Sequence, residues 1–232
     1  MPIKTIDWIE GKVKIIDQSK LPQKLEYAYC KDIETLREAI SSLKIRGAPA
    51  IGIAAAFGVV LGIKDSRSQD YLSFQKEIEK VIDYLARSRP TAVNLFWSLK
   101  RMRSCAEKNK GKKIKEIKTI LEKEALQIMR EDRQCNRQIG ENGARLIEDG
   151  ETILTHCNAG ALATADYGTA LGILYRAKEK GKTIKVYVDE TRPLLQGARL
   201  TTWELLREGI EVVLICDDMA GRVMQEGKIN KV

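Results

Sequence analysis

The chain has 232 residues, of which 44% are hydrophobic and 31% are charged, a composition typical of globular proteins and not of disordered ones. No apolar run reaches the roughly 18–20 residues that a membrane helix needs. The N-terminal residues lack the uninterrupted apolar region of a secretory signal. We therefore expect a cytoplasmic protein with one large domain or two small ones, and no membrane partner.

The net charge of +8 comes from the first 150 residues, which hold 29 Lys and Arg against 21 Asp and Glu. Much of this excess lies in residues 99–118. A basic segment can bind nucleic acid, but this one has no aromatic residue to stack on bases. We interpret it as a solvated loop between two helices, with a turn at Lys110–Lys113, and predict no nucleic-acid partner. Nucleic-acid binding is the weaker alternative.

Cysteine and histidine are sparse and scattered. His156 is the only histidine, and the cysteines form no CxxC pair. A structural zinc site needs clustered ligands, and a disulfide framework needs an even set of cysteines. The sequence therefore predicts neither for the five cysteines, which are Cys30, Cys105, Cys135, Cys157 and Cys216.

The N-terminal region begins with two short strand candidates, Val13–Ile16 and Leu25–Tyr29, separated by a turn-like segment. Asp32 is placed to cap a helix that runs through residues 36–40. Residues 46–49, Arg-Gly-Ala-Pro, then open a second helix. This helix is hydrophobic on all sides between residues 51 and 60, which predicts deep burial.

Three more helical patterns follow, at residues 71–86, after Arg89-Pro90-Thr91, and at about 115–146. The first 145 residues therefore predict a β-hairpin followed by a helical domain. For the helix after Pro90 we expect an apolar face made by Val93, Phe96, Trp97, Leu99 and Met102.

From residue 152 the pattern changes to repeated strand and helix. Three apolar runs of strand length, at residues 152–156, 184–190 and 212–218, are each followed by a helical segment, at about 163–180, 196–207 and 219–225. Gly181 and Gly209 lie where helices should end. Residues 146–232 therefore predict a Rossmann-like α/β domain with a parallel sheet. A fourth strand begins at residues 228–232, so we expect the domain to be incomplete at the C-terminus.

Polar or reactive residues follow each predicted strand. They are Cys157 and Asn158, then residues 189–192 (Asp-Glu-Thr-Arg), then residues 216–218 (Cys-Asp-Asp). Ligands of parallel sheets bind at the C-terminal ends of the strands, so we predict a site there. The alternative is that loops are simply polar.

The turn at Cys157 is the strongest local signal. Small residues between a strand and a helix expose backbone N–H groups that suit an anion and lower the pKa of a thiol. The alternative is that Cys157 is a small core residue. Adjacent residues on an extended chain point to opposite sides, so a Cys–His dyad is not expected, and we interpret His156 as a packed strand residue.

Four arginines lie beside Gly or Pro or at a predicted helix start, where a guanidinium can hold phosphate with two hydrogen bonds. Any one of them alone is more often a surface residue. With Cys157 they suggest acid/base chemistry on a phosphorylated small molecule, and no GxGxxG motif indicates a dinucleotide. The four are Arg46, Arg89, Arg192 and Arg199.

Four segments together carry a family resemblance: RGAPAIGIAAA (46–56), RPTAVNLFW (89–97), LTHCNAGALAT (154–164) and DETRPLLQGARLTTWEL (189–205). With them the chain resembles the methylthioribose-1-phosphate isomerase family of methionine salvage. The wider group also holds ribose-1,5-bisphosphate isomerases and regulatory subunits of the initiation-factor exchange complex. The resemblance implies conversion of 5-methylthioribose 1-phosphate to 5-methylthioribulose 1-phosphate by a homodimer without metal or organic cofactor.

The same resemblance implies roles for six residues. Cys157 would be the catalytic cysteine, and the substrate phosphate would be held by Arg46, Gly47, Ala48, Arg89 and Gln196. It also implies an acid/base aspartate in a GADR-type motif after the strand that begins at Ile229, beyond the 232 residues. Asp217 and Asp218 do not match that position. A non-catalytic module of the same fold that binds a sugar phosphate or nucleotide is therefore the alternative.

Overall fold

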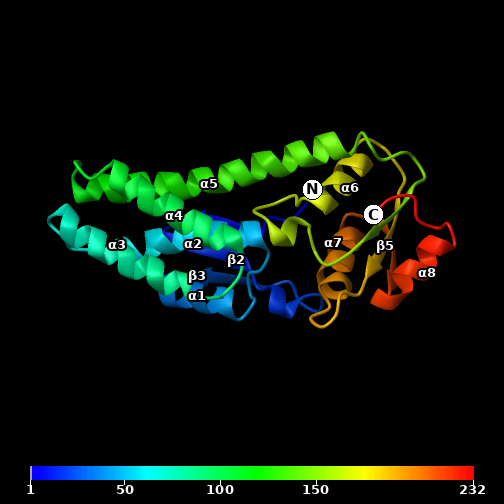
Figure 1. Ribbon diagram of the computed structural model, residues 1–232, viewed down its shortest axis with the longest axis horizontal. Helices are drawn as coiled ribbons and strands as arrows, with labels where there is room; N and C mark the ends of the chain where they lie inside the picture. The colour runs from blue at the N-terminus through cyan, green and yellow to red at the C-terminus, as the bar shows by residue number, and fades with distance from the viewer. Residues whose placement is uncertain (1) are drawn as a thin grey trace. The chain divides into compact units, whose positions relative to one another are not determined.

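The computed structural model describes residues 2–232, which form two compact units (Figure 1). The helical unit comprises residues 5–19 and 26–132, and the sheet unit comprises residues 2–4, 20–25 and 133–232. The predicted division at residue 145 stays a prediction. Among residues 2–232, no helix has both the length and the apolar character needed to cross a bilayer.

The helical unit begins with an antiparallel sheet of three strands, β1 (Ile6–Ile9), β2 (Lys12–Ile16) and β3 (Tyr27–Cys30), in the order β1-β2-β3. A two-residue turn with positive φ at Glu10 and Gly11 joins β1 to β2. The two predicted strands are confirmed, and β1 was missed. With only four residues and an Asp among them, β1 is too short for its alternation to stand out. A short 3-10 helix at Gln18–Lys20 follows β2.

Five helices follow: α1 (Ile33–Ser41), α2 (Ala48–Ile63), α3 (Tyr71–Ala86), α4 (Val93–Lys108) and α5 (Ile114–Gly143). Asp32 caps α1 as predicted, since its Oδ1 accepts a hydrogen bond from the Thr35 amide at 2.8 Å. Residues 110–113 form the predicted turn before α5. Helix α5 begins in the helical unit, and its residues from 133 onward belong to the sheet unit.

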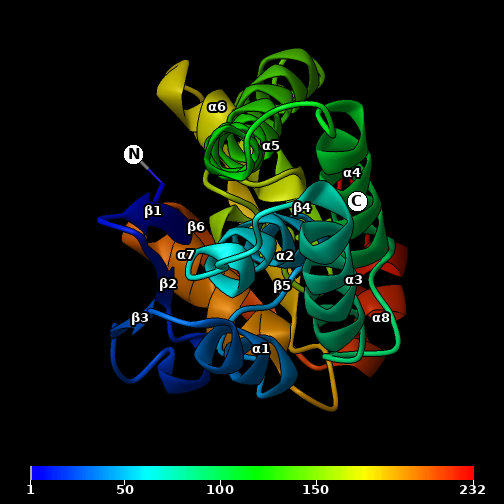
Figure 2. The same ribbon diagram turned by 90° about the vertical axis from the view of Figure 1, so that its left-hand side faces the viewer.

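Helix α2 forms the core of the helical unit, and α1, α3 and α4 surround it (Figure 2). Thirteen of its 16 residues are buried, which confirms the prediction from its all-round hydrophobicity. Phe57 is fully buried and stacks on Trp8 with ring centroids 5.1 Å apart. A Cβ at Gly52 would lie 2.9 Å from the Asn94 carbonyl, so the first turns of α2 and α4 are in close contact.

The predicted apolar face of α4 is partly wrong. Leu99 and Met102 are buried as expected, together with Leu95, Ser98 and Ala106, and this face packs on α2. Val93, Phe96 and Trp97 are instead exposed, with 81%, 44% and 47% of their surface accessible. The helix carries two apolar stripes, and periodicity alone does not tell which one faces the core.

The sheet unit has three parallel strands, β4 (Thr152–Thr155), β5 (Lys185–Asp189) and β6 (Glu211–Ile215), in the order β4-β5-β6. Its helices are α6 (Ala170–Glu179), α7 (Thr202–Arg207), which continues a π-helical turn at Gly197–Thr201, and α8 (Ala220–Gln225). Gly181 and Gly209 have φ of 86° and 66°, which confirms them as helix-ending residues. The predicted α/β class with a parallel sheet is confirmed.

The chain returns to β4 after α8. Residue Lys231 forms a parallel bridge with Ile153, and its carbonyl accepts a hydrogen bond from the Leu154 amide at 2.9 Å. Strand β4 therefore has β5 on one side and residue 231 on the other. The strand order reverses at β4, and such a reversal opens a ligand-binding crevice at the C-terminal end of the strand. That end leads into Cys157.

The helix after β4 starts later than predicted. A short 3-10 helix at Ala161–Ala163 comes first, and α6 begins only at Ala170. Tyr167 and Gly168 between them have φ of 69° and 83°, which no α-helix accommodates. Thr164 stabilises this break, because its Oγ1 donates to the Asp166 carbonyl at 2.8 Å and accepts from the Gly168 amide at 3.2 Å.

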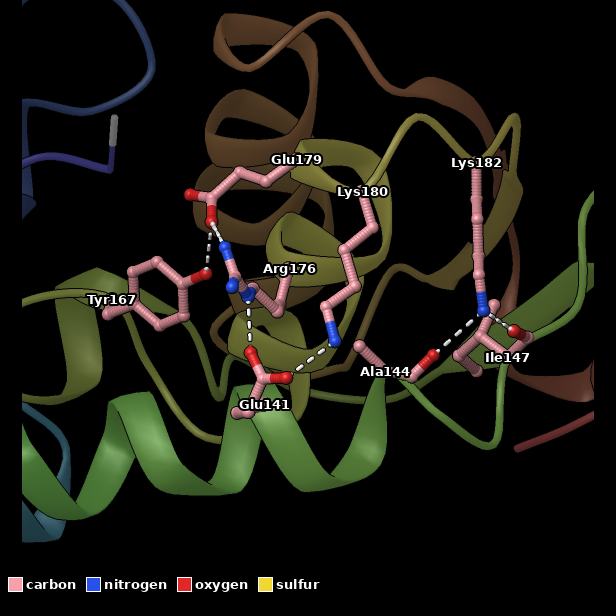
Figure 3. Close-up of polar contacts among 8 residues, drawn as sticks. All are labelled: Glu141, Ala144, Ile147, Tyr167, Arg176, Glu179, Lys180 and Lys182. Atoms are coloured by element: carbon pink, nitrogen blue, oxygen red, sulfur yellow. Dashed lines mark hydrogen bonds and ion pairs between the residues drawn. The ribbon is translucent and has the colours of Figure 1, made fainter.

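Ion pairs connect the end of α5 to α6 (Figure 3). The carboxylate of Glu141 contacts Arg176 Nε and Lys180 Nζ, both at 2.6 Å. These two hydrogen bonds lower the pKa of Glu141 to about 2, and the bond from Lys180 makes the larger contribution. Nearby, the Tyr167 hydroxyl donates to Glu179 at 3.0 Å. The last turns of α5 are thereby fixed to the sheet unit.

Candidate active site

Cys157 lies in a left-handed backbone conformation directly after β4. Its φ is +63°, which is costly for a residue other than glycine. Two hydrogen bonds hold this conformation. The Cys157 amide donates to Thr191 Oγ1 at 2.8 Å, and the Cys157 carbonyl accepts from Thr201 Oγ1 at 2.5 Å. Cys157 is half-buried, so it is neither a packed core residue nor a freely exposed one.

The residues after Cys157 surround the carboxylate of Glu204, a residue that the sequence analysis did not identify. Glu204 is buried and accepts hydrogen bonds from Asn158 Nδ2 at 2.8 Å, the Ala161 amide at 2.7 Å and the Tyr175 hydroxyl at 3.1 Å. Burial raises the pKa of Glu204, and these hydrogen bonds oppose that shift. The Ala161 amide therefore contacts a carboxyl group of the protein itself.

The end of β5 is held in a similar way. Thr191 has a φ of 61°, rare for a β-branched residue. Its amide donates to Asp217 Oδ1 at 2.7 Å, and the Arg192 amide donates to Asp217 Oδ2 at 2.8 Å. These backbone bonds, chiefly that of Arg192, lower the pKa of Asp217. Hydrogen bonds thus join the ends of β4, β5 and β6, as the convergence of parallel strands predicts.

His156 is not the packed strand residue that the sequence suggested. Its side chain is 61% exposed, and Nδ1 lies 3.1 Å from Oδ2 of the buried Asp189. A carboxylate accepts only, so Nδ1 carries the proton in this contact. His156, Asp189 and Asp217 each bring one potential ligand atom within 4.8 Å of the others. The contact with His156 engages Oδ2 of Asp189, and the two backbone amides engage both oxygens of Asp217.

Gln196 precedes the π-helical turn of the sheet unit. The loop that holds it is tied to Thr191, whose carbonyl accepts from the Leu195 amide at 2.8 Å. Gln196 Oε1 is buried and has no hydrogen-bond partner among residues 2–232. Arg199, by contrast, donates to the carbonyls of Leu21 and Leu194 at 3.1 Å and 3.3 Å, so its guanidinium already binds two backbone carbonyls.

In the helical unit, Arg46, Gly47 and Ala48 form the start of α2. Gly47 has a φ of 88° and no side chain caps the helix there. The N-terminus of a 16-residue helix therefore presents amides and the positive end of its dipole. Pro49 in the first turn fits this position as predicted.

Arg89 lies at the same end of the helical unit. The Ser41 hydroxyl donates to the Ser88 carbonyl at 2.9 Å, which fixes the segment before Arg89 to the last turn of α1, and α1 is followed by the Arg46 segment. Arg89 Nη2 donates to Thr91 Oγ1 at 3.2 Å, while its Nε is buried and has no hydrogen-bond partner in the part of the chain that the structure describes. The expected phosphate residues Arg46, Gly47, Ala48 and Arg89 thus belong to the helical unit, and Cys157 and Gln196 belong to the sheet unit.

Residues 44–232 match the initiation factor 2 subunit family, and the chain belongs to this family. Within it, the chain is similar to the methylthioribose-1-phosphate isomerases of Geotalea daltonii, at 52% identity over 99% of this chain and 66% of that protein, and of Thermotoga maritima, at 53% over 99% and 65%. The chain therefore spans slightly less than two thirds of the length of these relatives. The family resemblance of the sequence segments is confirmed.

Two solved structures share the fold and substantial sequence identity. The 5-methylthioribose 1-phosphate isomerase from Pyrococcus horikoshii OT3 is 40% identical with a TM-score of 0.90, over 97% of this chain and 63% of that one. The translation initiation factor eIF-2B, subunit delta, from A. fulgidus is 47% identical with a TM-score of 0.87, over 99% and 67%. Both support the fold described above.

Proposed function

We propose that this chain carries the thiol and phosphate-binding parts of an aldose–ketose isomerase that converts 5-methylthioribose 1-phosphate to 5-methylthioribulose 1-phosphate. The observation that carries the proposal is Cys157, held by Thr191 and Thr201 in a left-handed turn at the switch point of the sheet. Identity of about 52% to proteins named methylthioribose-1-phosphate isomerase supports the choice of substrate.

The reaction has three parts. The ring bond between C1 and the ring oxygen breaks, and that oxygen gains a proton. The hydrogen on C2 moves to C1, either as a proton through an enolate-like species or as a hydride. The C2 hydroxyl loses its proton and becomes the ketone. Cys157 is assigned to the acid/base part, for which a half-buried thiol at a strand end is placed well.

Arg46, Gly47, Ala48, Arg89 and Gln196 are assigned to the phosphate and sugar. The uncapped N-terminus of α2 supports the first three. Arg89 Nε and Gln196 Oε1 are buried without partners among the described residues, and such an atom costs about 1–3 kcal/mol, which a bound ligand would recover. A homodimer, a cytoplasmic location and independence from cofactors belong to the same proposal.

The test is turnover with protein in excess over 5-methylthioribose 1-phosphate, followed by ³¹P NMR. The acid/base aspartate that the resemblance implies lies outside the 232 residues, and loss of one such group slows a reaction by about 10²–10⁴-fold, so single-turnover conditions and long incubation are used. Cys157→Ser should lower the rate by about 10²–10⁴-fold. The matched control is Cys135→Ser, an exposed cysteine on α5, which should leave it unchanged. Full turnover by Cys157→Ser would refute the assignment.

A binding module without catalysis is the second candidate. It is favoured by the 47% identity to the structure named translation initiation factor eIF-2B, subunit delta. In this case calorimetry would detect binding of the sugar phosphate or of a nucleotide, and the same preparation would form no product in the single-turnover assay.

A further inference from the structure

We propose that Glu204 is a positioning residue for Cys157, acting as a built-in anion around which the turn after β4 folds. The inference rests on the proposed role of Cys157. It adds a residue from α7 to the machinery of that site.

The contacts of Glu204 indicate that its carboxylate is ionised. Its partners are the Asn158 side-chain amide, the Ala161 amide and the Tyr175 hydroxyl, with the Leu162 amide at 3.4 Å as a fourth and longer contact. Three of them are N–H groups, which only donate, and the Tyr175 hydroxyl is placed to donate as well, so an ionised carboxylate accepts at every position. Such charge-assisted hydrogen bonds are stronger than neutral ones.

The loop also fits around Glu204 sterically. Gly160 has an ordinary extended backbone, with φ of −97°, yet a Cβ there would lie 2.4 Å from Glu204 Oε2. The requirement for glycine is therefore one of space for the carboxylate and not of backbone conformation. Residues 158–162 close over the side chain and leave it only 3% exposed.

A short series of hydrogen bonds connects Glu204 to Cys157. Asn158 Nδ2 donates to Glu204 Oε1 and also lies 3.1 Å from Thr201 Oγ1. Thr201 Oγ1 in turn donates to the carbonyl of Cys157. Because Cys157 is in an unfavourable left-handed conformation, its position depends on these contacts.

The negative charge has a second consequence. The carboxylate already occupies the Ala161 amide and repels further negative charge, so the turn does not serve as a phosphate site. Removal of the charge should loosen the turn, which speeds the reaction of Cys157 with an alkylating agent.

The experiment compares the rates at which iodoacetamide alkylates each cysteine, resolved by mass spectrometry. In Glu204→Gln we expect Cys157 to react at least about threefold faster, because the turn opens. The exposed Cys135 and Cys216 in the same sample should keep their rates. Glu208→Gln, one turn later on the chain, is the matched control and should change none of them.

Hydrogen exchange of the Ala161 amide provides the second readout and should accelerate in Glu204→Gln. If that variant does not fold, Tyr175→Phe removes a single donor to the carboxylate and should shift the Cys157 rate and Ala161 exchange in the same direction by less. An unchanged Cys157 rate in a folded variant would overturn the proposal, as would equal acceleration at all cysteines. Neither readout needs substrate, so failure here is distinguishable from failure of the isomerase proposal in the turnover assay.

Discussion

Two segments of this protein are built to stabilise negative charge, and they do so in opposite ways. At the turn after β4, the Ala161 amide contacts the carboxylate of Glu204, so the anion is a permanent part of the fold. At the start of α2, Gly47 provides no side chain and no cap, so the helix N-terminus keeps its electrostatic attraction for an anion from outside.

The comparison separates two roles, a reactive thiol and a phosphate site, that the sequence alone assigned to the turn after β4. The small residues after β4 indicated both a reactive thiol and a phosphate site. In the structure Cys157 is half-buried at a switch point, which suits a reactive thiol, whereas the Ala161 amide of the same turn is already bound by Glu204. The phosphate role then rests on the Arg46 segment and on Arg89.

The largest effect, on ligand affinity, is expected at the uncapped N-terminus of α2. Arg46→Ala should weaken binding of 5-methylthioribose 1-phosphate by about 10–100-fold, since a hydrogen bond to a charged group contributes about 1.5–3 kcal/mol. Isothermal titration calorimetry measures this loss. Arg67→Ala, at an exposed arginine in the loop between α2 and α3, should bind normally. Equal affinities of the two variants would show that the phosphate does not bind at the start of α2.

The turn after β4, which encloses the Glu204 carboxylate, should lose stability when it is overpacked. Gly160→Ala places a methyl group against the Glu204 carboxylate, and such overpacking costs about 1–3 kcal/mol of unfolding free energy, measured by urea denaturation. Gly111→Ala is the control, since a Cβ there meets nothing within 4 Å, and it should change stability by no more than about 0.5 kcal/mol. A Gly160→Ala protein as stable as wild type would show that the turn adapts freely.

A smaller, pH-dependent effect is expected from Glu141, whose exposed carboxylate also has two cationic partners. Its pKa in the folded protein is lowered from 4.5 to about 2. The ion pairs therefore stabilise the fold above the unfolded pKa, and this contribution is lost as the pH falls from 4.5 toward 2. The difference in Tm between wild type and Glu141→Gln should be present at pH 6 and should disappear near pH 2. High salt should also reduce it. A difference that persists at pH 2 would exclude this origin.

Much of the fold was predictable because the signals are local. The burial of α2 follows from its composition, the start of α1 from Asp32, and the parallel sheet from three apolar runs with a helical segment after each. The convergence of Cys157, Asp189 and Asp217 at the strand ends follows from the rule for parallel sheets.

The contacts that the sequence did not reveal are long-range. Glu204 is 46 residues from Asn158, and nothing in TTWEL distinguishes a buried glutamate from a surface one on an amphipathic helix. The exposure of His156 depends on Asp189, 33 residues away. Likewise, the choice between the two apolar stripes of α4 depends on how closely Gly52 allows α2 to approach. Such facts come from packing between elements and not from periodicity.

The most direct test is amide hydrogen exchange with and without 5-methylthioribose 1-phosphate. The account predicts that the sugar phosphate slows exchange at the start of α2, at the amides of Ala48 and Ala50, and leaves the Ala161 amide unchanged, because Glu204 already occupies it. New protection at Ala161 together with none at Ala48 would contradict it, since the turn after β4 would then be the phosphate site.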